Sequence, residues 1–159
     1  MANEEHIRVL LRGLKAWRDW RQENPYAVPD LTDANLRGSD LKSFELKWAK
    51  LAGADLEGAN LRGADLKMAD LSGTRLMEAD LRAASLKQAN LAQADLSGAN
   101  LGGADLEGAS LKGADLAGAD LRWTRMSGAD IEGANLDGAK IAGAKLESAT
   151  GFQEWSRPK

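Results

Sequence analysis

The side chains that most often carry out catalysis are scarce in this sequence. It contains no cysteine, which excludes disulfides and thiolate metal sites. Its one histidine, His6, lies near the N-terminus. Thirteen aspartates lie between residues 30 and 137, but they recur at regular spacing and do not cluster. A carboxyl group that acts as a general acid needs a desolvated pocket to shift its pKa, so we expect no catalytic residue, no metal and no cofactor.

A period of five residues dominates the chain. Every fifth residue from Leu31 to Leu146 is aliphatic, which makes 24 positions, 21 of them leucine. A step of five turns by roughly 140° on an α-helix and changes face on a strand, so neither element buries them all. An alanine usually lies two positions before the leucine, as Ala54 lies before Leu56, and this spacing points both side chains the same way in an extended chain. Each Ala-Asp-Leu is therefore predicted to be a short strand, and the next two residues, often ending in glycine, a corner.

The repeats Ala-Asp-Leu-Glu-Gly at 54–58, Ala-Asn-Leu-Arg-Gly at 59–63 and Ala-Asp-Leu-Ala-Gly at 114–118 share the motif A(D/N)LxG. Over about residues 29–150 the chain resembles the pentapeptide-repeat family. The resemblance implies an all-β solenoid, a right-handed quadrilateral β-helix of about six coils. Four corners close each coil of twenty residues, and parallel strands stack at ~4.8 Å.

The chain is predicted to have three segments: an N-terminal capping helix and lead-in (1–28), the repeat β-helix (29–150), and a C-terminal tail or cap (151–159). Residues 4–23 carry apolar residues at helical spacing, and Asn3 is a plausible N-cap. We expect this helix to cover the open edge of the first coil, although binding to a membrane surface or a partner is an alternative. Phe44 is too large for an alanine position within a coil, so it is expected to lean toward the helix.

The C-terminal tail holds two aromatic residues, Phe152 and Trp155. They are expected either to fold over the last coil or to form a dimer contact. The resemblance implies the second option, because several pentapeptide-repeat proteins pair end-to-end through C-terminal residues. A homodimer through this end is therefore a hypothesis.

Charge differs among the four faces, which we name by the first leucine of each. The Leu31 and Leu36 faces carry net charges of −3 and −4, and the Leu41 and Leu46 faces +2 and 0. The family resemblance implies one known activity, protection of DNA gyrase by an acidic rod that mimics DNA. The six coils would match ~29 Å of duplex, which carries roughly 17 negative charges. Two faces that sum to −7 imitate this poorly, so DNA mimicry is an alternative and not the leading hypothesis.

Basic residues form two columns at the corners of the Leu46 face, over the first three coils. The columns are Lys42, Arg62 and Arg82, and Lys47, Lys67 and Lys87. Beside the second column Trp48, Met68 and Gln88 replace the usual corner glycine, so type II turns are not expected there.

Trp123 lies at the other border of the Leu46 face, in coil five. An exposed tryptophan beside cations often anchors a protein partner. It can also stack on single-stranded nucleic acid, or rest on lysine stems of an ordinary solvated surface. The candidate partner-binding residues are Trp48, Trp123, Lys47, Lys67, Lys87 and Met68.

These observations predict a non-catalytic protein-interaction scaffold that presents flat β-helix faces to an unidentified protein partner. The alternative is a DNA-mimic regulator or protector of a DNA-handling enzyme such as DNA gyrase. Direct binding of nucleic acid is disfavoured by the isoelectric point of about 5.3. No apolar run approaches the ~20 residues of a membrane span, and the start lacks a secretory signal, so a cytoplasmic location without membrane contact is expected.

Overall fold

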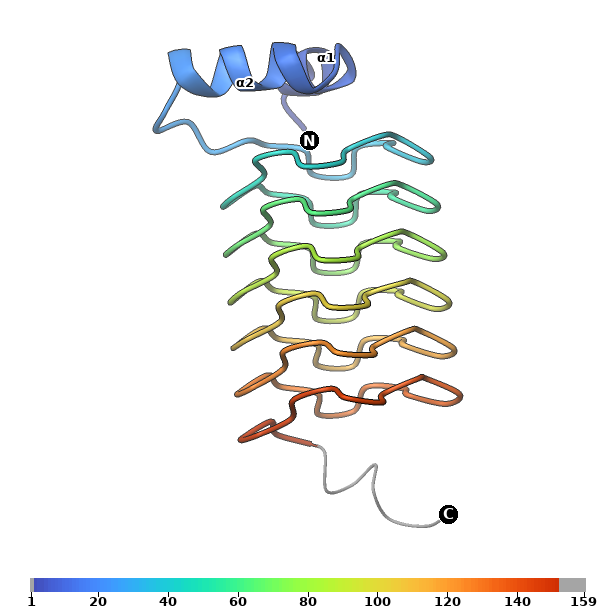
Figure 1. Cartoon of the computed structure of the whole chain (residues 1–159). Coiled ribbons are helices and arrows are strands. Elements are labelled where there is room, and N and C mark those ends of the chain that lie inside the picture. The colour runs from blue at the N-terminus through green and yellow to red at the C-terminus, as the bar shows by residue number, and fades with distance from the viewer. Residues whose placement is uncertain (1, 152–159) are drawn as a thin grey trace.

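The computed structural model describes residues 2–151 and shows two short helices at one end of a stack of coils (Figure 1). Helix α1 spans Glu4–Leu11 and helix α2 spans Leu14–Glu23. The helices cover the first coil, and the C-terminal end of the described residues lies at the opposite end of the stack.

The stack is built from single-residue strands. Every fifth residue from Asp30 to Asp130 forms a parallel β-bridge with the residue twenty positions later, and no longer strand occurs in residues 2–151. A period of twenty residues makes four pentapeptides per coil, so residues 29–148 form six coils. The predicted right-handed quadrilateral β-helix with an N-terminal helical cap is confirmed.

Backbone hydrogen bonds tie each coil to both of its neighbours. The residue before the leucine donates to the preceding coil, as Asp55 N does to Ala34 O at 2.9 Å. The leucine donates to the following coil, as Leu56 N does to Arg75 O at 2.8 Å. The second corner residue also donates to the following coil, and the alanine N–H closes the corner by donating to the preceding leucine carbonyl. Four of the five amides in a repeat are thereby paired with backbone.

The fifth amide, at the first corner position, is paired by a side chain in sixteen of the 24 repeats. Glu57 N donates to Asp55 Oδ1 at 3.1 Å. Every aspartate and asparagine at the middle-strand position, sixteen in all, accepts the same bond. These residues form Asx turns, which explains why the motif requires Asp or Asn. Sequence analysis placed these side chains outside but missed this role.

The second corner position, immediately before the alanine position, has a positive φ in all 24 repeats, between 54° and 73°. Glycine occupies 14 of these positions and other residues occupy ten. Trp48, Met68 and Gln88 have φ of 62°, 56° and 55°, so the prediction of a different turn at these corners is wrong. Stacking imposes the conformation, because the amide at this position must reach the following coil, as Trp48 N reaches Lys67 O at 3.0 Å.

Leucine and alanine side chains fill the interior from Leu31 to Leu121. Thr74 and Thr124 take alanine positions and are fully buried, and each hydroxyl donates to the carbonyl of the leucine three residues earlier at 2.7 Å. In coil six, Ile141 and Leu146 are only partly buried, because no further coil of the described chain covers them.

The cap differs from the single helix predicted for residues 4–23. Gly13 has φ of 97° and separates α1 from α2, a break that the glycine should have signalled. Leu11, one of the apolar residues at helical spacing that were expected to face the coil, is 59% exposed, whereas Trp20 is buried. The bend changes which residues of the second helix face the coil.

Three contacts fasten the cap to coil one. Trp17 lies 6.2 Å from Phe44 between ring centroids, and its Nε1 donates to Glu45 O at 2.9 Å. His6 Nδ1 accepts a bond from Asp30 N at 2.9 Å. The cap and the lean of Phe44 toward it are confirmed. Phe152 and Trp155 lie outside the described residues, so the tail contact and the homodimer remain predictions.

The Asx turn can be tested at Asp115, whose Oδ1 accepts from Ala117 N at 3.0 Å and from Asn135 Nδ2 at 3.1 Å. We expect Asp115→Ala to lower the free energy of unfolding by about 1 kcal/mol, because both bonds are lost. Asp115→Asn keeps the acceptor and should stay within about 0.5 kcal/mol of wild type. Urea denaturation measures both. Equal losses in the two variants would show that charge, and not the turn, is what matters.

The cap can be tested at Trp17. We expect Trp17→Ala to cost about 3–5 kcal/mol, since a fully buried ring is deleted. Trp17→Phe keeps most of the packing and loses the bond to Glu45 O, for about 1 kcal/mol. Tyr26→Ala, which changes a side chain that is almost fully exposed, is the matched control and should be near neutral. Denaturation of Trp17→Ala at the control's midpoint would contradict the capping role.

Candidate interaction surface

Trp48 and Met68 form an exposed apolar pair at one corner of the Leu46 face. Trp48 Nε1 lies 3.1 Å from Met68 Sδ, twenty residues further along the chain. The side chains are 45% and 49% exposed. Lys47 Nζ lies 4.1 Å from the centroid of the Trp48 ring, a cation–π contact. We call Lys47, Trp48, Lys67 and Met68 the Trp48 corner.

A shallow groove of about 400 Å³ runs from this corner toward coil five. Lysine stems and Met68 form its upper part, and smaller residues form its lower part. Its lining residues are Lys47, Lys67, Met68, Lys87, Gln88, Glu107, Gly108 and Ser127. The groove brings together all the candidate residues of sequence analysis except the two tryptophans.

The lysine column beside the groove is not uniformly positive. Lys87 Nζ pairs with Glu107 Oε2 at 3.0 Å and with Asp105 Oδ2 at 3.4 Å, and these carboxylates raise the pKa of Lys87. Lys67 Nζ lies 3.3 Å from Asp65 Oδ2. Within residues 2–151 Lys47 has no ion pair. Asp105 and Glu107 therefore neutralise Lys87, the third member of the expected basic column.

The neighbouring column at the Leu41 border shows the same trend. Arg82 Nη2 lies 2.5 Å from Asp80 Oδ2, and hydrogen bonding to this guanidinium lowers the pKa of Asp80. Lys42 and Arg62 form no ion pair in the described part of the chain. In these two columns, the cations without an ion pair are therefore Lys42, Lys47 and Arg62, in coils one and two.

Trp123 lies apart from the Trp48 corner. It is 72% exposed, and its ring covers Gly143, where an added Cβ would meet Cε3 at 2.3 Å. It is four coils from Trp48, roughly 19 Å along the axis, and on the opposite border of the Leu46 face. The predicted residues therefore form one cluster and one separate tryptophan.

Both tryptophans occupy strained positions. Each has φ of 62° at the corner position where glycine stands 14 times. A left-handed backbone costs a non-glycine residue roughly 1–2 kcal/mol. Trp48, at 45% exposed, offsets part of this cost by packing, and Trp123, at 72% exposed, offsets less. Strain that packing does not offset is more typical of functional positions.

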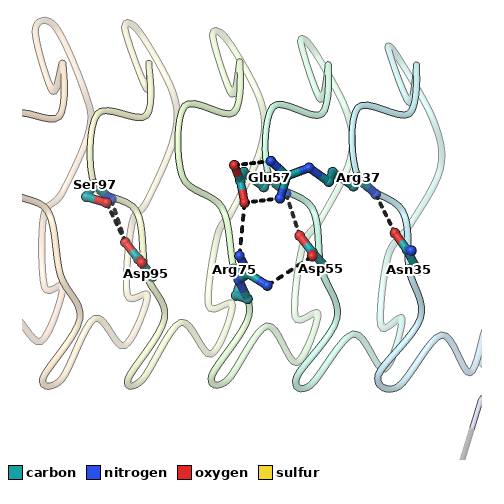
Figure 2. Close-up of polar contacts among 7 residues, drawn as sticks. All are labelled: Asn35, Arg37, Asp55, Glu57, Arg75, Asp95 and Ser97. Atoms are coloured by element: carbon teal, nitrogen blue, oxygen red, sulfur yellow. Dashed lines mark hydrogen bonds and ion pairs between the residues drawn. The ribbon is translucent and has the colours of Figure 1, made fainter.

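The acidic Leu36 face is largely paired internally over its first coils. Figure 2 shows Arg37 bonded to Glu57 through both guanidinium nitrogens. Arg75 bridges Glu57 at 3.0 Å and Asp55 at 3.2 Å. These two arginines are already included in the net charge of −4, and their ion pairs leave the negative charge of this face in coils three to six.

Sequence analysis missed one apolar surface at the cap. Leu10, Leu11, Leu14, Leu41 and Phe44 line a groove of about 440 Å³ below the bend between α1 and α2. The signal was Gly13, which turns Leu11 outward. Neither helix is long and apolar enough to cross a bilayer, and residues 2–151 hold no cluster of His, Asp or Glu suited to a metal ion.

The chain matches the family described as pentapeptide repeats in eight copies, over residues 30–65, 45–76, 74–113 and 114–150. No curated protein matches it.

Three solved structures are similar. A pentapeptide repeat protein from the Arabidopsis thaliana thylakoid lumen is 41% identical with a TM-score of 0.57, over 58% of this chain and 64% of that one. HetL, involved in heterocyst differentiation regulation in Nostoc sp. strain PCC 7120, is 41% identical with a TM-score of 0.44, over 74% and 60%. QnrB1, a plasmid-mediated fluoroquinolone resistance protein, is 19% identical with a TM-score of 0.41, over 74% and 71%. This chain spans about three fifths of the length of the first two.

The ion pair next to Trp123 predicts a pH dependence. The guanidinium of Arg122 lowers the pKa of Asp120 from 3.8 to about 2. Because this carboxyl is more acidic when folded, its contribution to stability is complete above about pH 4 and is lost as pH falls toward 2. We expect the stability difference between wild type and Asp120→Asn to shrink over that range, measured by urea midpoints. A difference that stays constant would contradict the prediction.

Proposed function

This chain belongs to the pentapeptide-repeat family, and we propose that it is a non-catalytic scaffold that binds a protein partner through its Leu46 face. The Trp48 corner is the proposed centre of contact. The repeat scaffold itself is established by the family match and the coil architecture. The partner and the contact are the proposal.

One observation carries it: an exposed tryptophan, strained at φ of 62°, paired with an exposed methionine and covered by a lysine. Tryptophan is enriched among residues that dominate binding energy at protein interfaces, and methionine is adaptable in contact. Glycine would suit the corner better for folding alone. A binding role gives a reason for keeping the strained residue.

The scaffold supports this role because its corners are rigid. Each corner is held by a backbone turn bond and by a bond to the following coil, where one exists, and in sixteen of the 24 repeats by an Asx turn as well. The Trp48 corner, which follows Glu45, has the two backbone bonds: Ala49 N donates to Leu46 O and Trp48 N to Lys67 O, both at 3.0 Å. A residue on such a corner loses little conformational freedom when a partner binds, which reduces the cost of association.

The alternative is a regulator of a DNA-handling enzyme such as DNA gyrase that acts through the acidic faces. Its electrostatic support is weaker, since the two acidic faces together carry −7, whereas a DNA duplex of the same length carries roughly 17 negative charges. The location stays a prediction as well. We propose the cytoplasm, while noting that one similar protein comes from the thylakoid lumen.

The test is affinity purification from extracts of the producing cells, comparing wild type with Trp48→Gly. Glycine fits the positive φ, so we expect the melting temperature of Trp48→Gly to equal or exceed that of wild type. Partner capture should fall by about tenfold or more, as for a residue at the centre of an interface.

Trp123→Gly is the matched control, because it removes the same side chain from an equivalent corner. Unchanged capture by Trp48→Gly would contradict the proposed contact. Loss of a DNA enzyme only from a third variant, Glu78→Gln/Asp95→Asn/Asp115→Asn, would favour the alternative.

A further inference from the structure

We infer that the segment bound at the Trp48 corner is an acidic peptide with an apolar residue. The inference rests on the proposed function and names the chemistry of its partner. It is carried by three cations without ion pairs in the described structure: one lies over the Trp48 ring, and two lie at the other border of the Leu46 face in coils one and two. They are Lys42, Lys47 and Arg62.

Charge on the first two coils of the Leu46 face is unbalanced. Two basic columns border the strand position that holds Glu45 and Asp65. Asp65 is engaged with Lys67 at 3.3 Å, so Glu45 is the acid of this part of the Leu46 face that forms no ion pair within residues 2–151, and Asp40 lies beyond the Lys42 border on the Leu41 face. Net positive charge on this exposed area is complementary to carboxylates of a partner.

Helix α2 extends the positive area toward the cap. Arg18 and Arg21 line a hollow together with Glu45, beside coil one. Arg21 Nη1 donates to Ala27 O at 2.7 Å, which fixes its position. Glu45 thus lies among cations from both the helix and the coil, and a partner meets an excess of positive charge there.

The far end of the same face lacks this excess. Asp105 and Glu107 lie 3.5 and 3.6 Å from the Arg125 guanidinium, and both also pair with Lys87. Over coils four to six the Leu46 face carries three acids, the third being Glu147, against Arg125 and Lys145, so it has no excess of positive charge, although Lys140 and Lys145 of coil six form no ion pair within residues 2–151. This contrast places the acidic contact in coils one and two.

The dimensions suit a short extended segment. Each face is one repeat wide, so a partner strand of about five residues, at ~3.3 Å each, spans it from the Lys42 border to the Lys47 border. Carboxylates near the two ends would meet the cations. An apolar side chain next to one end would pack on Trp48 and Met68, at the mouth of the groove.

Nucleic acid fits this surface less well. A phosphodiester chain is charged at every step, and Glu45 and Asp65 lie in the middle of its path. A peptide can place carboxylates at the borders and leave the middle neutral. The chain's net charge of −3 also opposes a polyanion.

The experiment is selection of random twelve-residue peptides, displayed on phage, against the immobilised full-length protein. We expect enriched peptides to contain more Asp and Glu than the starting library and at least one large apolar residue. Charge reversal in Lys42→Glu/Lys47→Glu/Arg62→Glu should weaken synthetic copies by at least tenfold. The control Arg125→Glu/Lys140→Glu/Lys145→Glu makes the same charge change at the other end and should alter affinity less than about twofold.

The remaining outcomes separate the two ideas. Peptides without acidic enrichment that are lost in Trp48→Gly but retained by the reversal would overturn the acidic inference and leave the proposed function standing. Peptides that bind all variants equally, or no enrichment at all, would overturn the inference and count against the surface itself. Binding of a fluorescent twenty-residue oligothymidylate, lost in the reversal and steeply weakened by salt, would assign the surface to nucleic acid instead.

Discussion

The pairing of the five backbone amides in each repeat is the constraint on which the stack depends. One bridge residue per repeat leaves too little regular structure to pair all the polar groups, and an unpaired amide with limited access to water costs about 1–3 kcal/mol. Four amides of a repeat reach backbone carbonyls in the preceding coil, the following coil or the same corner. In sixteen of the 24 repeats the middle-strand Asp or Asn, as Asp55 does for Glu57 N, pairs the fifth. Once that bond is present the repeat is self-contained, and the leucine and alanine side chains can be buried without regular helices or sheets.

Several parts of the fold follow from the sequence because they are periodic. The spacing of leucine fixes a coil of twenty residues, and the oversized Phe44 at an alanine position points to the cap. The corners at Trp48 and Met68 were mispredicted, because intrinsic preference for glycine was given more weight than the bond that each corner amide makes to the following coil. The break at Gly13 was missed for the opposite reason, since an apolar spacing was trusted over a single glycine. Non-periodic features of this kind depend on three-dimensional context.

The candidate surface was only partly accessible from sequence. The columns of residues twenty apart correctly placed Lys47, Lys67 and Lys87 together, because stacking is a consequence of the period. Their effective charge could not be read in this way, since Lys87 is bound to carboxylates from the following coil while Lys47 lies over an aromatic ring. Partners that lie across a coil boundary depend on side-chain reach and rotamer, which the repeat does not determine. The same holds for Arg75, which joins two acids of the preceding coil.

In this architecture, core packing and the display of binding groups use different positions of the repeat. Inward positions are restricted to small and aliphatic residues, and the middle-strand position is mostly restricted to Asp or Asn. The two corner positions are restricted only by exposure and, at the second of them, by positive φ. A protein of this kind can therefore acquire a binding site by placing a costly residue at a corner without disturbing the core. Trp48 fits this description: it forgoes the conformational advantage of glycine, at roughly 1–2 kcal/mol, and leaves the buried Leu46 and Ala49 on either side unchanged. The fold tolerates this cost because all 24 corners contribute to closing the coils. Contact with Met68 and with Lys47, which forms no ion pair within residues 2–151, distinguishes Trp48 from Trp123.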